Sequence, residues 1–401
     1  MVTQVESHWW ARDHLGYRDG RLAFCGRDVA QTAATFAEPL FMYDAQRPIE
    51  KLRSIERALN RHAVRHRLFY AMKANRFAPL LCALRADGRY GVDACSPEEL
   101  REALACGFAP SQISYTSHGM APDEAALLAA LPEVLVNCDT LAAVRMMGAY
   151  GTRREIGLRI NPGLGIGYGN NERLLYAGRT TKFGIYREQF DEAIALARES
   201  GLAVTRLHCH AGCGYLDAQL RAFEAVLDAV CDFADALPGI REINLGGGLG
   251  VPHRAADKPL DLDAWAAVIA LRTRRLGVTI AVEPGDFVVK DAGLLVLQVN
   301  YIEKKRDVVF AGLSGGFNLA VEPAFYDLPC EAAPCVLRDG EPSRVTLAGN
   351  INEALDLWAS DVMLPPLTTG DYVALLNAGG YAASMSSNHC MRGRFREMLL
   401  C

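Results

Sequence analysis

Residues able to do nucleophilic and acid–base chemistry recur along this sequence, each just after a short apolar run. Lys73 follows the first run and Glu283 follows the eighth. A lysine amine is a nucleophile for carbonyl groups, and histidine and glutamate side chains transfer protons. A lone lysine is usually a surface charge, but eight runs that all end this way predict one active site. The residues at these ends are Lys73, Asp93, Ser117, His118, Asn137, Arg159, Asn161, His208, His210, Gly246 and Glu283.

The apolar runs alternate with amphipathic stretches, such as residues 97–105 and 218–236, that show helical periodicity. Repeated strand–helix units predict a parallel sheet, and eight of them predict a closed (β/α)₈ barrel of the α/β class. Barrel enzymes build their active sites at the carboxyl ends of the strands, which is where the reactive residues fall. The eight predicted strands are residues 68–72, 90–92, 113–115, 134–136, 156–160, 204–207, 243–245 and 279–282.

The chain changes character after Glu283. Its strand-like segments are then separated by turns, without strong helical patterns, which predicts an all-β domain. A strand-like segment near the start, residues 21–29, is expected to join that domain. We therefore expect an N-terminal segment (1–40) belonging to the β domain, a barrel (41–288) and a C-terminal β domain (289–401). The later predicted strands are residues 294–299, 308–310, 335–337, 344–347 and 372–376.

A glycine run, Gly246, Gly247 and Gly248, follows the seventh predicted strand. Successive glycines leave backbone N–H groups free to converge on an anion. Alone, such a run is weak evidence because it often marks a tight turn. Barrels, however, commonly bind phosphate with the loops after strands seven and eight. We therefore expect a phosphate site formed by these three glycines together with Gly250 and Gly285.

Motifs covering most of the chain occur in the order typical of a known family. The chain resembles the fold-type III pyridoxal-phosphate decarboxylases, the group of diaminopimelate and ornithine decarboxylases, whose fold is like that of alanine racemase. The resemblance implies a carboxy-lyase that uses pyridoxal 5'-phosphate, and the final motif is notably similar to that of diaminopimelate decarboxylases. The motifs are YAMKAN (70–75), VDACS (92–96), RINP (159–162), TKFG (181–184), HCHAG (208–212), GGGLG (246–250), EPG (283–285), AGGY (378–381) and SMSSN (384–388).

The resemblance implies roles for the barrel residues. Lys73 would bind the cofactor covalently through its ε-amine. Glu283 would keep the cofactor's ring nitrogen protonated, because a nearby negative charge favours the protonated form. The protonated ring accepts the electrons that departing CO₂ leaves behind. His210 would stack on the ring, and Asp93 and Arg159 would support the ring and the lysine.

The resemblance also implies roles for the predicted β domain. Tyr381 would donate a hydrogen bond to the phosphate. The family forms a head-to-tail homodimer with shared active sites, so Glu353 and Asp356 would enter the neighbouring subunit's pocket. A surface turn with two solvated carboxylates is the alternative for these two residues. Asn352 stands where the family has an active-site cysteine that controls protonation after decarboxylation, and the replacement puts the outcome of that step in question.

Two further departures concern the distal end of the substrate. Asp286 and Glu322 stand where the family has arginines that bind a distal carboxylate, and Tyr326 belongs to the second of these motifs. A substrate carboxylate would meet like charge there, which is unfavourable. We therefore predict an amino acid or amino acid conjugate other than diaminopimelate, with a neutral or cationic distal end, as in siderophore or other specialised metabolism.

Other functions stay open at this point. A diaminopimelate decarboxylase proper, of lysine biosynthesis, is one alternative. A racemase would place an arginine near the ring nitrogen, so Glu283 counts against it. A catalytically inactive, decarboxylase-like binding or regulatory protein would account for Asp286, Glu322 and Asn352. Such a protein would have no physical reason to retain Lys73 and the other residues of the cofactor site.

Composition bears on partners and location. The formal net charge is −5 and no basic run occurs, so nucleic acid is not an expected partner. No apolar stretch is long enough to span a membrane and the opening segment is polar, so we expect a cytoplasmic protein. The twelve cysteines are scattered, and Cys209 and Cys213 lack the second cluster of a structural zinc site. We expect free thiols and no metal.

Overall fold

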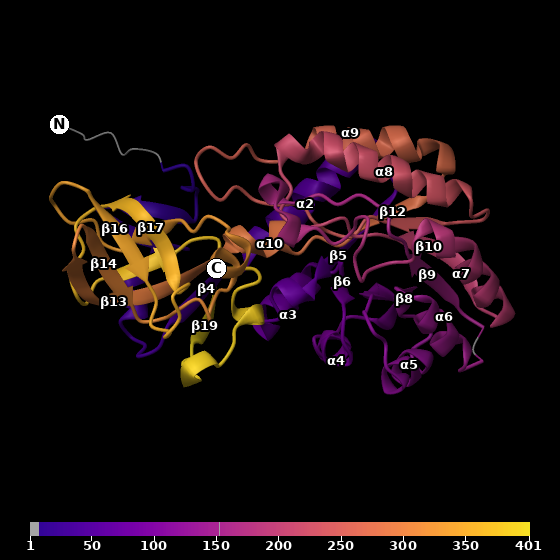
Figure 1. The fold of residues 1–401 in the computed structure, drawn as a ribbon, viewed down its shortest axis with the longest axis horizontal. Helices are drawn as coiled ribbons and strands as arrows, with labels where there is room; N and C mark the ends of the chain where they lie inside the picture. The colour runs from indigo at the N-terminus through magenta and orange to yellow at the C-terminus, as the bar shows by residue number, and fades with distance from the viewer. Residues whose placement is uncertain (1–7, 152) are drawn as a thin grey trace. The chain divides into compact units, whose positions relative to one another are not determined.

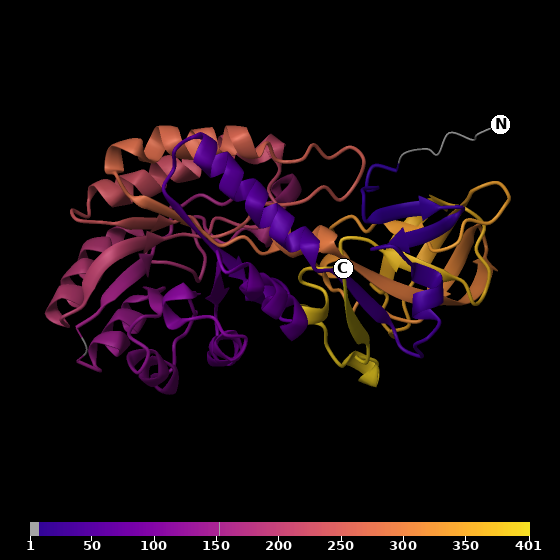
Figure 2. The same ribbon diagram turned by 180° about the vertical axis from the view of Figure 1, so that it is seen from behind.

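The computed structural model describes residues 8–151 and 153–401, and Figures 1 and 2 show its ribbon from opposite sides. The chain divides into two compact units. The barrel unit comprises Pro48–Val251 and Lys258–Val288, and the β unit comprises the described residues up to Arg47 together with Pro252–Asp257 and Val289–Cys401. These limits differ from the predicted domain boundaries in two places. The first division falls after Arg47 and not after residue 40, and a short loop at 252–257 belongs with the β unit.

The barrel unit contains eight strands that close on themselves in the order β10-β11-β12-β5-β6-β7-β8-β9, all paired in parallel. Each strand overlaps one of the predicted runs, so the predicted (β/α)₈ barrel is confirmed. The strands are β5 (His66–Ala71), β6 (Gly91–Ala94), β7 (Ile113–Tyr115), β8 (Leu135–Cys138), β9 (Glu155–Arg159), β10 (Ala203–His208), β11 (Glu242–Asn244) and β12 (Thr279–Val282).

Helices follow the barrel strands, and Figures 1 and 2 show α8 and α9 lying side by side. Several of these helices are capped by a side chain, as where the side chain of Ser96 accepts from the backbone N–H of Glu99. Helix α2 buries Leu52, Ile55 and Leu59 along one stripe. The helices are α2 (Gln46–Arg61), α3 (Ala78–Asp87), α4 (Pro97–Ala105), α5 (Pro122–Ala129), α6 (Leu141–Gly148), α7 (Arg187–Glu199), α8 (Leu220–Asp235), α9 (Leu262–Thr273) and α10 (Asp286–Val289).

The β unit contains an eight-stranded sheet and a three-stranded sheet, β1-β2-β3. In the large sheet the order is β15-β18-β13-β14-β16-β17, and β4 pairs with both β13 and β19. The strands are β1 (Leu15–Arg18), β2 (Arg21–Phe24), β3 (Arg27–Asp28), β4 (Leu40–Asp44), β13 (Gly293–Lys305), β14 (Val308–Leu313), β15 (Ala332–Pro334), β16 (Ser343–Ala348), β17 (Leu357–Leu364), β18 (Tyr372–Leu375) and β19 (Arg396–Leu400). Two short helices, α1 (Val29–Ala33) and α11 (Glu322–Tyr326), complete the unit.

The predicted all-β domain is therefore confirmed, with differences in detail. The predicted strand at 335–337 is wrong, because this segment forms only an isolated bridge between Val336 and Arg21. The predicted strand at 21–29 divides into β2 and β3, and helix α1 begins at Val29. Strands β1, β4, β15, β17 and β19 were not predicted. Among the described residues, no helix combines the length and the apolar character that crossing a bilayer requires.

Candidate active site

Lys73 lies in a single helical turn, Met72–Ala74, at the carboxyl end of β5. Its Nζ is 2.6 Å from Oδ2 of Asp93, which lies on the neighbouring strand β6. Burial on its own would lower the pKa of Lys73, but Asp93, Cys95 and Glu283 raise it above its ordinary value. The side chain of Lys73 is nevertheless 38% exposed. Its amine is therefore held in place by an ion pair while remaining accessible to a small molecule.

Asp93 is buried at 1% exposure in the middle of the barrel. Burial, and next the charge of Glu283, raise the pKa of Asp93 to about 7, although Lys73 acts in the opposite direction. A carboxylate whose pKa is raised by burial, 2.6 Å from an amine, can exchange a proton with that amine. Asp93 can therefore both hold the Lys73 amine in place and exchange a proton with it.

Glu283 follows strand β12 and receives hydrogen bonds from three other barrel strands. Its Oε1 accepts from Ser114 Oγ at 2.7 Å and from Asn244 Nδ2 at 2.6 Å, and its Oε2 lies 2.9 Å from His208 Nε2. Burial would raise the pKa of Glu283, but His208, Lys73 and these hydrogen bonds lower it to about 2. Glu283 is therefore a permanent buried anion at physiological pH, able to keep a neighbouring ring nitrogen protonated.

Ser114 and Asn244 were not predicted as site residues, and His208 was noted only for its position at a strand end. All three are nearly fully buried polar side chains on β7, β11 and β10. The signal that could have found them is a polar residue inside a short apolar strand, because a buried polar group needs a partner. Their shared partner is Glu283.

His210 follows β10 and is surrounded by cationic groups. Burial, and next Arg159 and Lys73, lower the pKa of His210 well below its ordinary value, so the ring is neutral. Its ring centroid is 5.0 Å from that of Tyr176, in a tilted arrangement. Within the described residues, the buried Nδ1 of His210 has no hydrogen-bond partner. The neutral, flat ring of His210 could therefore stack on an aromatic ligand, and its Nδ1 could form a hydrogen bond with a bound group.

Arg159 and Asp139 connect this site to the TKFG segment. The guanidinium of Arg159 lies 4.5 Å from the centroid of the Phe183 ring and 3.5 Å from Oδ1 of Asp139. Asp139 also accepts from the backbone N–H of Gly184 at 2.7 Å and lies 2.5 Å from Nδ1 of His118. Asp139 was missed in the sequence, although it directly follows strand β8. It fixes the loop against which Arg159 packs.

The glycine run packs closely against the HCHAG loop. Gly246 and Gly248 adopt left-handed backbone angles, with φ of 65° and 99°. A Cβ on Gly246 would lie 2.5 Å from the carbonyl oxygen of Cys209, and one on Gly248 would lie 2.4 Å from that of Gly212. Only glycine allows this approach. The two loops are thereby held against each other at the carboxyl ends of β10 and β11.

Some of the predicted phosphate donors are used inside the protein. The N–H of Gly246 donates to Asn244 Oδ1 at 2.9 Å, and the N–H of Gly250 donates to the carbonyl of Tyr215 at 3.0 Å. In this structure the N–H groups of these two glycines are bonded within the protein, and the two residues allow the close approach of the loops. Phosphate binding by Gly247, Gly248 and Gly285 stays a prediction.

Residues predicted to bind the substrate are divided between the two units. Asp286 begins helix α10 in the barrel unit and is 5% exposed. Glu322 and Tyr326 are the first and last residues of helix α11 in the β unit. The carboxylate of Glu322 accepts from Nζ of Lys290 at 2.6 Å, and Lys290 is buried at 1% exposure. Glu322 is therefore one half of an ion pair.

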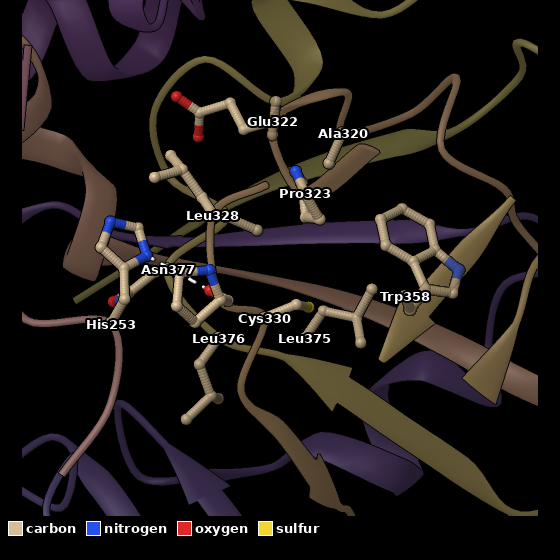
Figure 3. Close-up of a pocket in the computed structure, with 13 residues that line it drawn as sticks. His253, Ala320, Glu322, Pro323, Leu328, Cys330, Trp358, Leu375, Leu376 and Asn377 are labelled. Carbon is tan, nitrogen blue, oxygen red and sulfur yellow. Dashed lines mark hydrogen bonds between the residues drawn. The ribbon is translucent and has the colours of Figure 1, made fainter. Parts of the chain in front are cut away.

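Glu322 also lines a small cavity in the β unit, together with residues such as His253 and Trp358 (Figure 3). The cavity measures about 30 Å³, which is room for one or two water molecules. Burial, and next the charge of Lys290, lower the pKa of His253 to about 3, so this histidine is neutral. In this unit, the cation in contact with Glu322 is Lys290, at 2.6 Å.

The segment predicted to reach a second subunit is largely exposed. Asn352 and Glu353 lie on the surface of the β unit, with Glu353 Oε1 3.5 Å from His389 Nε2. Asp356 is buried, and its two oxygens accept from the backbone N–H groups of Phe317 and Ile351 at 2.7 and 2.6 Å. Asp356 thus holds the turn together within its own chain. A role for any of the three in a partner's site stays a prediction.

Tyr381 also belongs to the β unit and has a left-handed backbone angle, φ of 54°. Such a conformation is uncommon for a residue other than glycine and costs energy that the surroundings must supply. This observation motivates a functional position for Tyr381, and its hydrogen bond to a phosphate stays a prediction.

Comparison with known proteins places this site in a family. A family model described as "Pyridoxal-dependent decarboxylase, pyridoxal binding domain" matches residues 47–290. The diaminopimelate decarboxylase of Methanothermobacter thermautotrophicus is 34% identical, over 95% of this chain and 91% of the relative. That of Pseudomonas aeruginosa is 31% identical, over 97% of this chain and 94% of the relative. The crystal structure of diaminopimelate decarboxylase from Helicobacter pylori, complexed with L-lysine, superposes with a TM-score of 0.84 at 25% identity, covering 92% and 93% of the two chains.

Proposed function

Because this chain belongs to the pyridoxal-dependent decarboxylases, we propose that it is a diaminopimelate decarboxylase, which removes one carboxylate of diaminopimelate as CO₂. The chain is a pyridoxal-phosphate-dependent amino acid decarboxylase by its family. The observation that carries the choice of substrate is the 34% identity to an enzyme of that name over 95% of the chain. A racemase does not account for this membership, and the retention of Lys73, Glu283 and His210 counts against an inactive binding protein.

The residues present fit pyridoxal phosphate. Lys73 offers an accessible amine, Glu283 a buried anion, and His210 a neutral ring with an unsatisfied nitrogen. When bound, the cofactor supplies an electron-accepting ring for the decarboxylation. Around it, Glu283 would hold the proton on the ring nitrogen, His210 would fix the tilt of the ring, and Asp93 would exchange a proton with Lys73. These assignments rest on the contacts inside the barrel unit.

The prediction of a substrate other than diaminopimelate, based on Asp286 and Glu322, is wrong. Relatives named diaminopimelate decarboxylase, at 34% and 31% identity over nearly the whole chain, overturn it. The physical reason is that Glu322 was counted as an unbalanced anion. Its 2.6 Å contact with the buried Lys290 cancels that charge at short range. The charge reversal at Glu322 therefore does not leave an unbalanced anion, because Lys290 supplies the opposite charge.

Turnover of diaminopimelate is the first test. The purified enzyme, loaded with pyridoxal phosphate, should release CO₂ and form lysine from diaminopimelate. Its kcat/KM should exceed that for ornithine, arginine or lysine by at least about 100-fold, because a site built to bind a polar group rejects analogues that lack it. The measurement is CO₂ release with each amino acid under identical conditions. Turnover of one of the other amino acids without turnover of diaminopimelate would overturn the proposal.

A homodimer with shared sites is a second part of the proposal, supported by the exposure of Asn352 and Glu353. Mixing the inactive variants Lys73→Ala and Glu353→Ala should restore about a quarter of wild-type activity, because half the dimers are hybrids and each hybrid has one intact site. Activity is measured after subunit exchange has been verified by native mass spectrometry.

The matched control for this experiment mixes Lys73→Ala with Glu283→Ala. Both residues belong to the barrel unit, so every site in the hybrid lacks one of them and no activity should return. Equal recovery in the two mixtures, or none in either, would contradict sites shared through Glu353.

The proposed function also includes an amino acid as the substrate and the cytoplasm as the location of the enzyme.

A further inference from the structure

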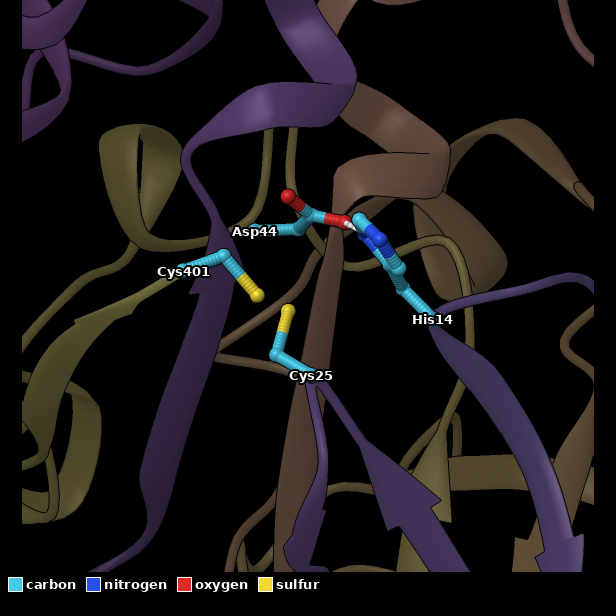
Figure 4. Close-up of side chains that lie close together, drawn as sticks. All are labelled: His14, Cys25, Asp44 and Cys401. Carbon is cyan, nitrogen blue, oxygen red and sulfur yellow. Dashed lines mark hydrogen bonds and ion pairs between the residues drawn. The ribbon is translucent and has the colours of Figure 1, made fainter.

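Four side chains from distant parts of the sequence converge in the β unit (Figure 4). They are His14, Cys25, Asp44 and Cys401, and one ligand atom of each lies within 4.8 Å of those of the others. Nδ1 of His14 is 2.8 Å from Oδ2 of Asp44. We propose that these four residues form a binding site for a single divalent cation of the zinc class.

Paired strands bring the four residues together. His14 directly precedes β1 and Cys25 directly follows β2, and these two strands form a hairpin in which Leu15 faces Phe24. The backbone N–H of Cys25 donates to the carbonyl of His14 at 2.8 Å, which fixes the two residues opposite each other. The first two ligands therefore come from one rigid hairpin.

The other two ligands come from a second strand pair. Asp44 ends β4, Cys401 directly follows β19, and the parallel pairing of these strands sets Leu400 beside Asp44. The backbone N–H of Ala45 donates to the carbonyl of Leu400 at 2.9 Å and continues this pairing beyond the strand end. Ligands that stand at the ends of paired strands are held more precisely than ligands on long loops.

Asp44 is oriented by the start of helix α2. Its Oδ1 accepts from the backbone N–H groups of Gln46 and Arg47 at 2.8 and 3.1 Å, which leaves Oδ2 directed toward His14. Asp44 is 1% exposed, whereas Cys401 is exposed. Hydrogen bonds that orient a ligating carboxylate from behind are typical of metal sites, and the exposed cysteine gives an ion a way in.

The donor set favours zinc over other common cations. Two sulfurs, one imidazole nitrogen and one carboxylate oxygen match the ligands of tetrahedral Zn²⁺, while Ca²⁺ and Mg²⁺ prefer oxygen alone. Zinc bonds of about 2.0–2.3 Å require ligand atoms closer together than 4.8 Å, so modest side-chain movement would complete the coordination. Cys25 and Cys401 are both free thiols here, as metal binding requires.

Motif searches could not find this site, because its two cysteines lie at opposite ends of the chain and neither has a neighbouring ligand in sequence. None of the four residues belongs to the cofactor site. The ion would tie the first hairpin and the last strand to β4, so its effect should be on stability and not on the chemical step.

Cobalt binding tests the proposal on the intact, cofactor-loaded enzyme. After reduction and chelator treatment, titration with Co²⁺ should give one equivalent bound per chain and a thiolate-to-cobalt absorption band, read as a difference spectrum. Zn²⁺ should displace the cobalt and raise the Tm by at least about 3 °C. Cys401→Ser, at an exposed position, should weaken cobalt binding by at least about 100-fold without affecting folding.

A matched control uses a second pair of neighbouring cysteines. Cys82 and Cys106 also lie near each other, in the barrel unit, and Cys82→Ser with Cys106→Ser should leave cobalt binding unchanged. The absence of a thiolate–cobalt band in folded wild-type enzyme, or an undiminished band in Cys401→Ser, would overturn the proposal. So would a Cys25–Cys401 disulfide in the enzyme isolated without reductant, because those sulfurs could not then bind a metal.

Discussion

Replacement of Lys73 by alanine should abolish both the visible absorbance of the bound cofactor and the release of CO₂. The amine of Lys73 is the nucleophile that would bind the cofactor covalently, and an alanine side chain at this position has no amine. We expect kcat/KM to fall by at least about four orders of magnitude. An absorbance scan and a CO₂-release assay on the same preparation measure the two effects.

The matched control is Lys258→Ala. Lys258 is a lysine of the same unit, 76% exposed and paired with Asp217 on the surface, so its removal should change neither signal. A Lys73→Ala variant that keeps the absorbance and turns over normally would place the attachment point on another residue. Loss of both signals in the control as well would point to a general failure of folding.

Replacement of Glu283 by glutamine should lower kcat by about 100- to 10,000-fold while the cofactor stays bound. The amide keeps the size of the side chain but removes the negative charge that favours a protonated ring nitrogen. Because the pKa of Glu283 is about 2, the wild-type enzyme should show no loss of activity from its protonation between pH 4 and 7. The measurements are kcat and the cofactor absorbance of both proteins across this pH range.

Glu242→Gln is the matched control for that change. Glu242 is also buried and lies on barrel strand β11, but at its amino end, near Arg67. Residues at that end of a barrel serve stability and not catalysis, so kcat should stay within about twofold. An unchanged kcat in Glu283→Gln would show that the ring nitrogen has a different partner.

The barrel could be predicted from the sequence because each strand is a short apolar run and each is followed by a helical pattern. The strands that were missed could not be recognised for different reasons. Strand β17 buries only Trp358 and Leu364 among its eight residues, so its pattern is that of an exposed edge. Strand β4 is apolar, but its partners β13 and β19 come from the far end of the chain.

The site could be predicted in part for the same reason. Adjacent strands bring Lys73 and Asp93 together, and order along the chain is enough to expect that contact. The hydrogen bonds that Glu283 receives depend on which way each strand's side chains point, and this is set by register. Glu322 and Lys290 lie 32 residues apart in the β unit, and no local pattern reveals their pairing.

The position of β4 between β13 and β19 has a consequence for how the protein is made. Its five residues, Leu40–Asp44, are all buried in the finished sheet, yet both neighbours emerge from the ribosome only after the entire barrel has been translated. Until then β4 is an apolar strand with two open edges, the kind of segment that pairs with other chains. Synthesis therefore passes through an interval in which all the barrel strands have been made and β4 still lacks both of its partners. Yield in a cell should follow translation speed and chaperone supply more closely than the stability of the folded enzyme.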